Sequence, residues 1–205
     1  MAIEEPSQYV EESGLVIMEA ENSLSDIDLW VRKTDVSEFT GSSYLEFTGN
    51  RPLNGDPMSP LEYTFKINQG GLYFLHMHVA RENVEINGEI RTDVANDGFV
   101  RLGGDYTQGP NAGNSHGDDA PLATLQTDTK FFGGNDNEFV WATGNRLDLG
   151  GHNNKRVAVY NLKAGETYTF TLQGRSQFFK VDRIVFRHAS VSRNSAQDTT
   201  KGETR

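Results

Sequence analysis

The sequence predicts an all-β fold, either a sandwich or a barrel, and two observations carry this prediction. Short runs of residues alternate between apolar and polar side chains with a period of two, which is the spacing of a β-strand. Clusters of Gly, Asn, Asp and Pro separate these runs, and Gly alone accounts for 21 of the 205 residues. Convincing helical periodicity is missing, so the strands are expected to build the whole core.

About ten segments show the strand pattern. Residues 72–79 alternate clearly: the odd-numbered residues from Tyr73 to Val79 fall on one face, and the even-numbered residues from Leu72 to His78 fall on the other. The full set of expected strands is 15–21, 29–32, 43–47, 61–67, 72–79, 98–102, 138–142, 156–162, 167–172 and 180–187.

Composition divides the chain into a polar lead-in at residues 1–13, one domain at residues 14–188, and a flexible linker or tail at residues 189–205. The tail has no aromatic residue and no periodicity, which is typical of linkers. Within the domain, the Gly-rich stretch 103–119 is too long for a hairpin connection, and long loops in compact domains are often functional or mobile.

The charge balance excludes several function classes. With 29 acidic and 19 basic residues the net charge is −10, which argues against nucleic-acid binding and against docking on an anionic membrane. No apolar run approaches the roughly 18 residues of a membrane helix, so no membrane insertion is expected. The acidic N-terminus is no signal peptide. Cys is absent, which removes disulfides, thiolate metal sites and Cys nucleophiles and leaves the compartment open.

Enzyme motifs for nucleotide, phosphate, zinc-peptidase or serine-hydrolase chemistry are absent from the sequence, so no catalytic residue is predicted. His76 and His78 lie two apart on one strand and share a face. Two imidazoles at that spacing can ligate a transition metal, but the pattern is more typical of polar residues on an outer strand face.

Acidic residues suggest a cation site instead. Glu19 and Glu21 project from one strand face, where two anions repel each other unless a positive charge lies between them; Ca²⁺ is one solution and an exposed acidic edge is the other. Asp182 lies in an apolar closing strand, where it shares a face with Lys180 and Ile184 and needs a partner. Arg183 is expected on the opposite face, so a cation shared with the first strand would satisfy Asp182.

Three sequence segments carry a family resemblance. An opening strand that ends in EAE at residues 19–21, a YLEF strand at 44–47 and a closing FFKVDRIVF strand at 178–186 together resemble carbohydrate-binding modules of the β-sandwich group that includes families 6 and 35. The NDGFVR segment at 96–101 also resembles a strand of relatives attached to polysaccharide-degrading enzymes. The resemblance covers roughly residues 14–188.

The resemblance implies a jelly roll of two packed antiparallel sheets, with a structural Ca²⁺ that joins the first strand to the last. Carried onto this sequence, its side-chain ligands would be Glu19, Glu21 and Asp182. Backbone oxygens near Thr40 and Ser43 would complete the coordination shell.

The resemblance also implies a sugar site, either on the loop rim or on the concave face of one sheet. At the rim, Lys180 stands where the family pattern has Asn, so Lys180 and Arg175 are expected to pair with a sulfate or carboxylate on the glycan. Trp141 and Tyr106 are the expected aromatic platforms, and His116 lies in the same Gly-rich loop as Tyr106. The alternatives are that Trp141 belongs to the core and that Tyr106 anchors its loop.

The favoured function is a non-catalytic carbohydrate-binding module of a secreted or cell-surface bacterial enzyme, with a catalytic module in the same polypeptide. Its ligand would be a polysaccharide, and an algal, anionic polymer is one expectation. Two other functions stay open. One is a small jelly-roll lyase or hydrolase, and the other is a lectin-like adhesion domain.

Overall fold

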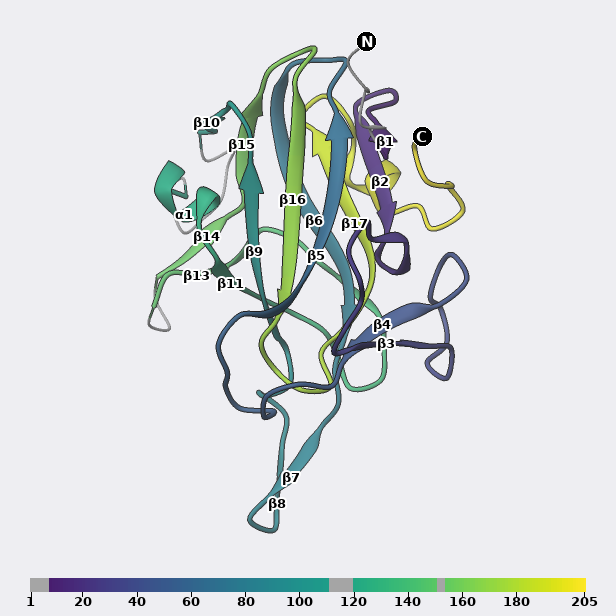
Figure 1. Cartoon of the computed structure of the whole chain (residues 1–205), viewed down its shortest axis with the longest axis vertical. Coiled ribbons are helices and arrows are strands. Elements are labelled where there is room, and N and C mark those ends of the chain that lie inside the picture. Colours follow the sequence, from purple (N-terminus) through teal and green to yellow (C-terminus); the bar gives the residue numbers. More distant parts are fainter. Residues whose placement is uncertain (1–7, 111–119, 151–153) are drawn as a thin grey trace.

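Two sheets packed face to face form the body of the molecule, as the computed structural model shows for residues 8–110, 120–150 and 154–205 (Figure 1). The predicted all-β sandwich is confirmed, and all ten expected segments contain a strand. The chain passes repeatedly from one sheet to the other, which gives the jelly roll. No helix in the described residues is long and apolar enough to cross a membrane.

The first sheet has seven strands, and it lies in front in Figure 1. Its outermost strand β1 runs parallel to its neighbour, whereas the other pairs in this sheet are antiparallel. In spatial order the strands are β1 (Tyr9–Val10), β5 (Met58–Lys66), β16 (Thr167–Gly174), β9 (Asp97–Gly103), β11 (Thr129–Phe132), β13 (Asn145–Asp148) and β14 (Lys155–Val157).

The second sheet has eight strands and is wholly antiparallel. Six of them follow in spatial order: β10 (Thr107–Gln108), β15 (Val159–Leu162), β6 (Gly71–Ala80), β17 (Lys180–His188), β4 (Tyr44–Phe47) and β3 (Trp30–Lys33). Two more attach to central strands, β12 (Val140–Ala142) to β6 and β2 (Leu15–Glu19) to β17. The remaining elements are the hairpin β7 (Val84–Ile86) and β8 (Glu89–Arg91), and the short helices η1 (Ala20–Asn22), α1 (Leu122–Gln126) and α2 (Arg193–Ala196).

The core lies between the sheets and is rich in aromatic rings. On β6, the odd-numbered residues from Tyr73 to Val79 are buried in it, as the alternation predicts. Phe186 of β17 contacts Phe65, Tyr160 and Phe170, with ring centroids 4.8 to 5.5 Å apart. These rings fix the spacing of the sheets, because each one buries a large apolar area and packs edge-on or tilted against its neighbours.

The alternation expected for the closing strand is wrong beyond its middle, because β17 contains a bulge at Asp182. The register with β6 shifts between Val181 and Arg183. An inserted residue reverses the facing of everything after it. Val181 and Ile184 therefore both enter the core, while Arg183 points to the outer face of the sheet.

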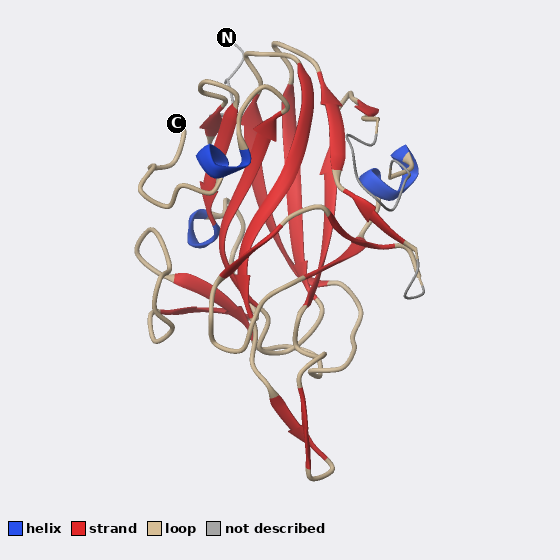
Figure 2. Cartoon of the chain, turned by 180° about the vertical axis from the view of Figure 1, so that it is seen from behind, coloured by secondary structure: helices blue, strands red, loops and turns tan. Residues whose placement is uncertain are grey.

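The tail predicted to be flexible, residues 189–205, packs against the outer face of the second sheet. Figure 2 shows α2 lying over the strands. Ala196 of α2 joins an apolar cluster with Leu15, Ile17 and Val185. Beyond the helix, the Thr204 N–H donates to the Ile17 carbonyl at 3.2 Å, and the Ile17 N–H donates to the Thr204 hydroxyl at 3.1 Å. The outer face of β2 and β17 is itself apolar, so it needs this cover.

Part of the polar lead-in packs on the sandwich as well. Within the polar lead-in, β1 adds to the edge of the first sheet and Tyr9 is fully buried. The Tyr9 hydroxyl donates to the Glu203 carboxylate at 2.8 Å, which ties the two ends of the chain together.

The tail also explains why His76 is buried. Its Nε2 accepts a hydrogen bond from Arg187 at 3.1 Å, and its Nδ1 has no partner in the described residues. Burial, together with the charges of Arg187 and Arg193, lowers the pKa of His76 to about 3. The imidazole is therefore neutral in the native state at neutral pH.

We expect His76 to make the protein less stable in mild acid. The unfolded imidazole gains a proton below about pH 6.5, whereas the native one stays neutral until about pH 3. Stability contributed by this group is thus lost as the pH falls, by up to about 1.4 kcal/mol per pH unit. Urea unfolding at about pH 7, 6 and 5 should show a shallower pH dependence for His76→Gln than for the wild type. His188→Gln, at a half-buried site, is the control, and equal slopes for the wild type and His76→Gln would contradict the prediction.

Candidate functional site

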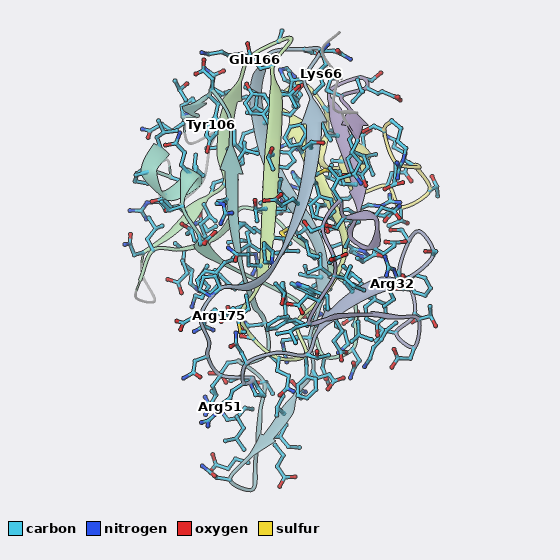
Figure 3. The ribbon with its side chains drawn as sticks, viewed as in Figure 1. Arg32, Arg51, Lys66, Tyr106, Glu166 and Arg175 are labelled. Atoms are coloured by element: carbon cyan, nitrogen blue, oxygen red, sulfur yellow. The ribbon has the colours of Figure 1, made fainter. Side chains whose placement is uncertain are left out.

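The four described residues predicted to contact sugar do not form one site. Tyr106 and Arg175 lie at different ends of the first sheet (Figure 3). Tyr106 is only 3% exposed: its hydroxyl donates to the Leu102 carbonyl at 2.8 Å, and its ring packs edge-on against Tyr160 and Tyr168. It therefore anchors its loop in the core and offers no platform at the rim. His116 lies outside the described residues.

The two cations predicted to bind an anionic sugar group already have acidic partners. Lys180 is fully buried, and its amine lies 3.0 Å from both the Glu46 and the Glu82 carboxylates. It is placed there because Lys180 pairs with Glu46 across β17 and β4. Arg175 lies 2.6 Å from the carboxylate of Asp97, the first residue of β9. The prediction that Lys180 binds a sulfate or carboxylate of the glycan is therefore corrected, because its charge is paired with protein carboxylates inside the fold.

The predicted metal ligands do come together, around the side chain of Thr40. The Thr40 hydroxyl lies 2.6 Å from Glu19 Oε2 and 3.0 Å from Asp182 Oδ2, and the Thr40 N–H donates to Asp182 Oδ1 at 2.8 Å. Glu21 is held slightly apart, where its Oε1 accepts from the N–H groups of Ser42 and Ser43 at 2.7 and 3.3 Å. The first strand, the turn before β4 and the last strand thus meet at one point.

A guanidinium and an imidazole pair with the carboxylates of this cluster. The Arg183 guanidinium pairs with Glu19 Oε1, and His78 Nδ1 lies 2.7 Å from Asp182 Oδ2. Two buried oxygens, Glu21 Oε2 and Ser43 Oγ, have no partner in the described residues. No group of three or more His, Asp or Glu side chains in the described part of the chain is placed to hold a metal ion. Hydrogen-bond donors occupy Glu19 and Asp182, whereas Glu21 Oε2 and Ser43 Oγ are left for a further partner, so calcium binding stays a prediction.

A cavity of about 830 Å³ opens beside this cluster. Its floor is formed by the outer face of the second sheet, through Glu19, His78 and Arg183. One wall is the turn at residues 38–41, and the other is the tail at residues 199–203. The tail is fixed to the floor, because the Glu19 N–H donates to the Glu203 carboxylate at 3.0 Å.

A row of aromatic rings passes beside the cavity, and two of its members, Phe39 and His78, line it. Phe39 in the wall packs against Tyr44, and Tyr44 packs edge-on against Phe139, at 6.1 and 5.1 Å between centroids. Phe139 then contacts His78 at 5.3 Å, and His78 stacks on Trp141 at 4.8 Å. Trp141 and Phe39 at the two ends of the row are partly exposed. Of the predicted platforms, Trp141 is the one with ring surface outside the core.

The electrostatics of the floor are set by burial. Burial raises the pKa of Glu19, although hydrogen bonds from Arg183 and Thr40 act in the opposite direction. Glu19 therefore binds a proton more readily than an exposed glutamate does. The lining combines three carboxylates, from Glu19, Glu38 and Glu203, with two basic groups, from Arg183 and Lys201. Such a mixed set offers both donors and acceptors to a hydroxylated ligand.

Sequence reasoning missed the tail residues and Arg183. The tail lacks apolar periodicity. The sequence cue that it packs on the domain lies in the strands, because the outer face of β2 and β17 is apolar and needs a cover. The sequence predicts Arg183 on the face away from Asp182, but the bulge puts both on the outer face, where Arg183 reaches Glu19 and Asp182 reaches His78. Direct pairing of Arg183 with Glu19 in the register could be found only once the order of the strands is known.

Comparisons with known proteins place the fold. No family model matches the sequence, and no curated protein matches it. Among solved structures, the chain is similar to a GH26-CBM35 β-(1,4)-mannanase from Podospora anserina, with 12% identity, a TM-score of 0.52, and coverage of 88% of this chain and 29% of that one. It is also similar to a family 35 carbohydrate binding module from Clostridium thermocellum, with 15% identity, a TM-score of 0.47, and coverage of 86% and 100%.

These likenesses concern the fold. The chain spans less than a third of the mannanase, and the identities are low. The resemblance to a carbohydrate-binding β-sandwich, first indicated by the EAE, YLEF and FFKVDRIVF segments, is confirmed at that level.

We expect the Arg183 side chain to stabilise the native state by neutralising Glu19. Arg183→Met leaves Glu19 buried without a cation, which should cost about 3–5 kcal/mol of unfolding free energy. Adding Glu19→Gln to that variant should restore part of the loss, and urea unfolding measures both. In the Arg183→Met variant, calcium should raise the melting temperature more than in the wild type, because the guanidinium no longer occupies Glu19. Magnesium at equal concentration is the ionic-strength control.

A wild-type melting temperature that rises strongly with calcium and falls with EDTA would show that the metal competes successfully with Arg183. Equal stability of Arg183→Met and the wild type would show that the ion pair is unimportant.

Proposed function

We propose that the chain is a non-catalytic carbohydrate-binding module that holds a polysaccharide-degrading enzyme against its substrate. One observation carries the proposal: the partly exposed Phe39 ring lines a cavity rich in hydroxyl, carboxylate and amine groups, and a row of rings leads from it to the partly exposed Trp141. The fold, which is similar to that of a mannanase that carries a family 35 module, is compatible with this function.

The cavity suits the chemistry of a sugar. The C–H faces of a pyranose ring pack on aromatic surfaces such as Phe39 and Trp141, while its hydroxyl groups need planar or hydroxylic partners. Glu38, Lys201 and the hydroxyls of Thr199 and Thr200 line the walls and can supply them. A cavity of about 830 Å³ is within the usual range for small-ligand sites, so it can receive a few sugar residues of a longer polymer.

The acidic groups on the floor favour binding over catalysis. A glycosidase needs two carboxylates that are free to transfer protons or to attack the sugar. Glu19 is instead tied to Arg183 and Thr40, and Asp182 is tied to His78 and Thr40. Glu203 accepts hydrogen bonds from Tyr9 and from the Glu19 backbone. These bonds hold the acids as structural groups.

The biological setting follows from this role. A binding module linked to a catalytic module in one polypeptide raises the effective concentration of the enzyme at an insoluble polymer. We therefore place the protein outside the cell or on its surface, in a bacterium that degrades polysaccharides.

Removing either exposed ring should weaken polysaccharide binding without unfolding the domain. We expect Trp141→Ala and Phe39→Ala each to lose about 1–3 kcal/mol of binding free energy, which is the size of an aromatic hot spot. Affinity electrophoresis against a panel of neutral plant and algal polysaccharides, followed by calorimetry with the best ligand, measures the loss. Tyr106→Phe is the matched control, because Tyr106 lies in the core and should leave binding unchanged.

Normal binding by both Trp141→Ala and Phe39→Ala would move the sugar site away from the cavity. The bound polysaccharide should also stay intact. Formation of new reducing ends or unsaturated products that a single substitution abolishes would make the protein an enzyme on the same scaffold.

A further inference from the structure

A group of basic side chains gathers on the outer face of the first sheet, on the opposite side of the sandwich from the cavity. Register places them together: Lys130 of β11 lies opposite Asp148 of β13, and Asp148 lies opposite Lys155 of β14. Directly opposed residues in a sheet project to the same side. We call the side chains of Arg101, Lys130, Phe132, Arg146 and Lys155 the basic face.

The charge balance on this face is opposite to that of the whole chain. Its four cations and the adjacent Arg175 make five positive charges, and the carboxylates that pair with them are those of Asp97, Asp128 and Asp148. Five against three leaves an excess of two positive charges, in a protein whose net charge is −10.

Each of these carboxylates already has a cation. Arg101 lies 2.5 Å from Asp128, and Lys130 lies 2.6 Å from Asp148. Asp97 takes Arg175. The excess charge therefore belongs to two other residues of the face, Arg146 and Lys155.

Neither Arg146 nor Lys155 forms a close ion pair in the described part of the chain, although the charge of Lys155 acts on Asp148 and Asp97, and both cations are placed over one aromatic ring. The Arg146 guanidinium lies 5.3 Å from the centroid of Phe132, and the Lys155 amine lies 4.3 Å from it. Beyond that ring, Arg146 donates one long hydrogen bond, at 3.4 Å, to the Thr143 carbonyl. Arg146 is half-buried, and this burial lowers the pKa of its guanidinium. Two cations held at one ring repel each other, and the nearby Asp148 is already paired with Lys130, so an added anion is stabilised by both.

The same face offers contacts for the rest of a sugar. Phe99 and Phe132 are both partly exposed on it. Gln173, which lies opposite Phe99 across β16 and β9, is only 7% exposed, and its Nε2 has no hydrogen-bond acceptor among the described residues. Ring surface, an unused amide donor and unpaired cations together are what an acidic sugar residue needs.

We propose that the basic face binds the sulfate or carboxylate groups of an acidic polysaccharide, with Arg146 and Lys155 beside Phe132 as the primary contacts. The proposal rests on the proposed function, because it takes the ligand to be a glycan. Nucleic acid is the less favoured polyanion: the excess is two charges, and the surrounding protein is strongly acidic. Arg175, for which an anionic contact was predicted from the sequence, lies at the edge of this face but is neutralised by Asp97.

The test compares charged and neutral polymers with the full chain. Probes are dextran sulfate for sulfate groups, polygalacturonate for carboxylate groups and unsubstituted dextran as the uncharged reference. The test variant is Arg146→Gln/Lys155→Gln. The matched control is Arg32→Gln/Lys66→Gln, which removes the same charge from two exposed cations that lie away from the basic face (Figure 3). Thermal melts confirm that both variants fold, and Lys155→Gln alone replaces the double variant if that one does not.

The wild type should bind at least one of the two acidic polymers, with an affinity that falls as salt is added. The test variant should lose about tenfold or more of that affinity, while the control should stay within about twofold of the wild type. Preference for dextran sulfate or for polygalacturonate then identifies the anionic group.

Several results would overturn the proposal. One is equal binding of acidic polymers by the test variant and the wild type, and another is an equal loss in the control. The third is that single-stranded DNA of equal charge binds as tightly as dextran sulfate and depends on the same two residues, which would make the face a general polyanion site. If a neutral polysaccharide binds through Phe39 and Trp141 and no acidic one binds, the inference about the basic face is wrong and the proposed function stands. Binding of no polysaccharide at all would sink the proposed function as well.

Discussion

The buried ionic cluster at the junction of β2 and β17 is the constraint on which the rest of the architecture depends. Glu19 and Asp182 would each be costly to bury as isolated anions, and the fold offsets that cost with Arg183, His78 and the Thr40 turn. Because these partners come from β17, β6 and the segment before β4, satisfying two carboxylates fixes the relative positions of four chain segments. The Glu19 N–H then fixes a fifth, by donating to Glu203 in the tail.

That last bond explains why the outer face of the second sheet is divided into two parts. Over Ile17 and Val185 the tail packs closely, and it buries His76 as a neutral side chain. Over Arg183 and His78 the tail stands away from the sheet and leaves the cavity. The same segment is thus a cover for apolar strands and a wall for a polar site. The composition of the tail predicts neither role, because neither one requires a periodic pattern of apolar residues in the tail.

Sequence patterns predict strands well in this protein because alternation is a local property: every expected segment contains a strand. They also indicate that Glu19 and Asp182 share a site. Sequence patterns do not reveal which outer face of a sheet is covered by another segment of the chain. They also do not reveal which ion pairs form between strands. Tyr106 was placed at the rim because its loop is Gly-rich, yet the loop returns its ring to the core. The sequence predicts a glycan contact for Lys180, because Glu46 and Glu82 become its neighbours only through long-range strand pairing.

The two sheets pack with their apolar faces together, so the cavity and the basic face point in opposite directions. Both lie on outer surfaces, and the full thickness of the sandwich separates them. A stiff polysaccharide strand that occupies the cavity therefore cannot also lie along β11, β13 and β14. If both faces bind, they bind different strands or different stretches of a folded one, and the affinity for a gel or fibre exceeds that for a short oligosaccharide through multivalency. The opposite charge of the two sites adds selectivity, because a cavity lined by three carboxylates disfavours the acidic residues that the basic face attracts.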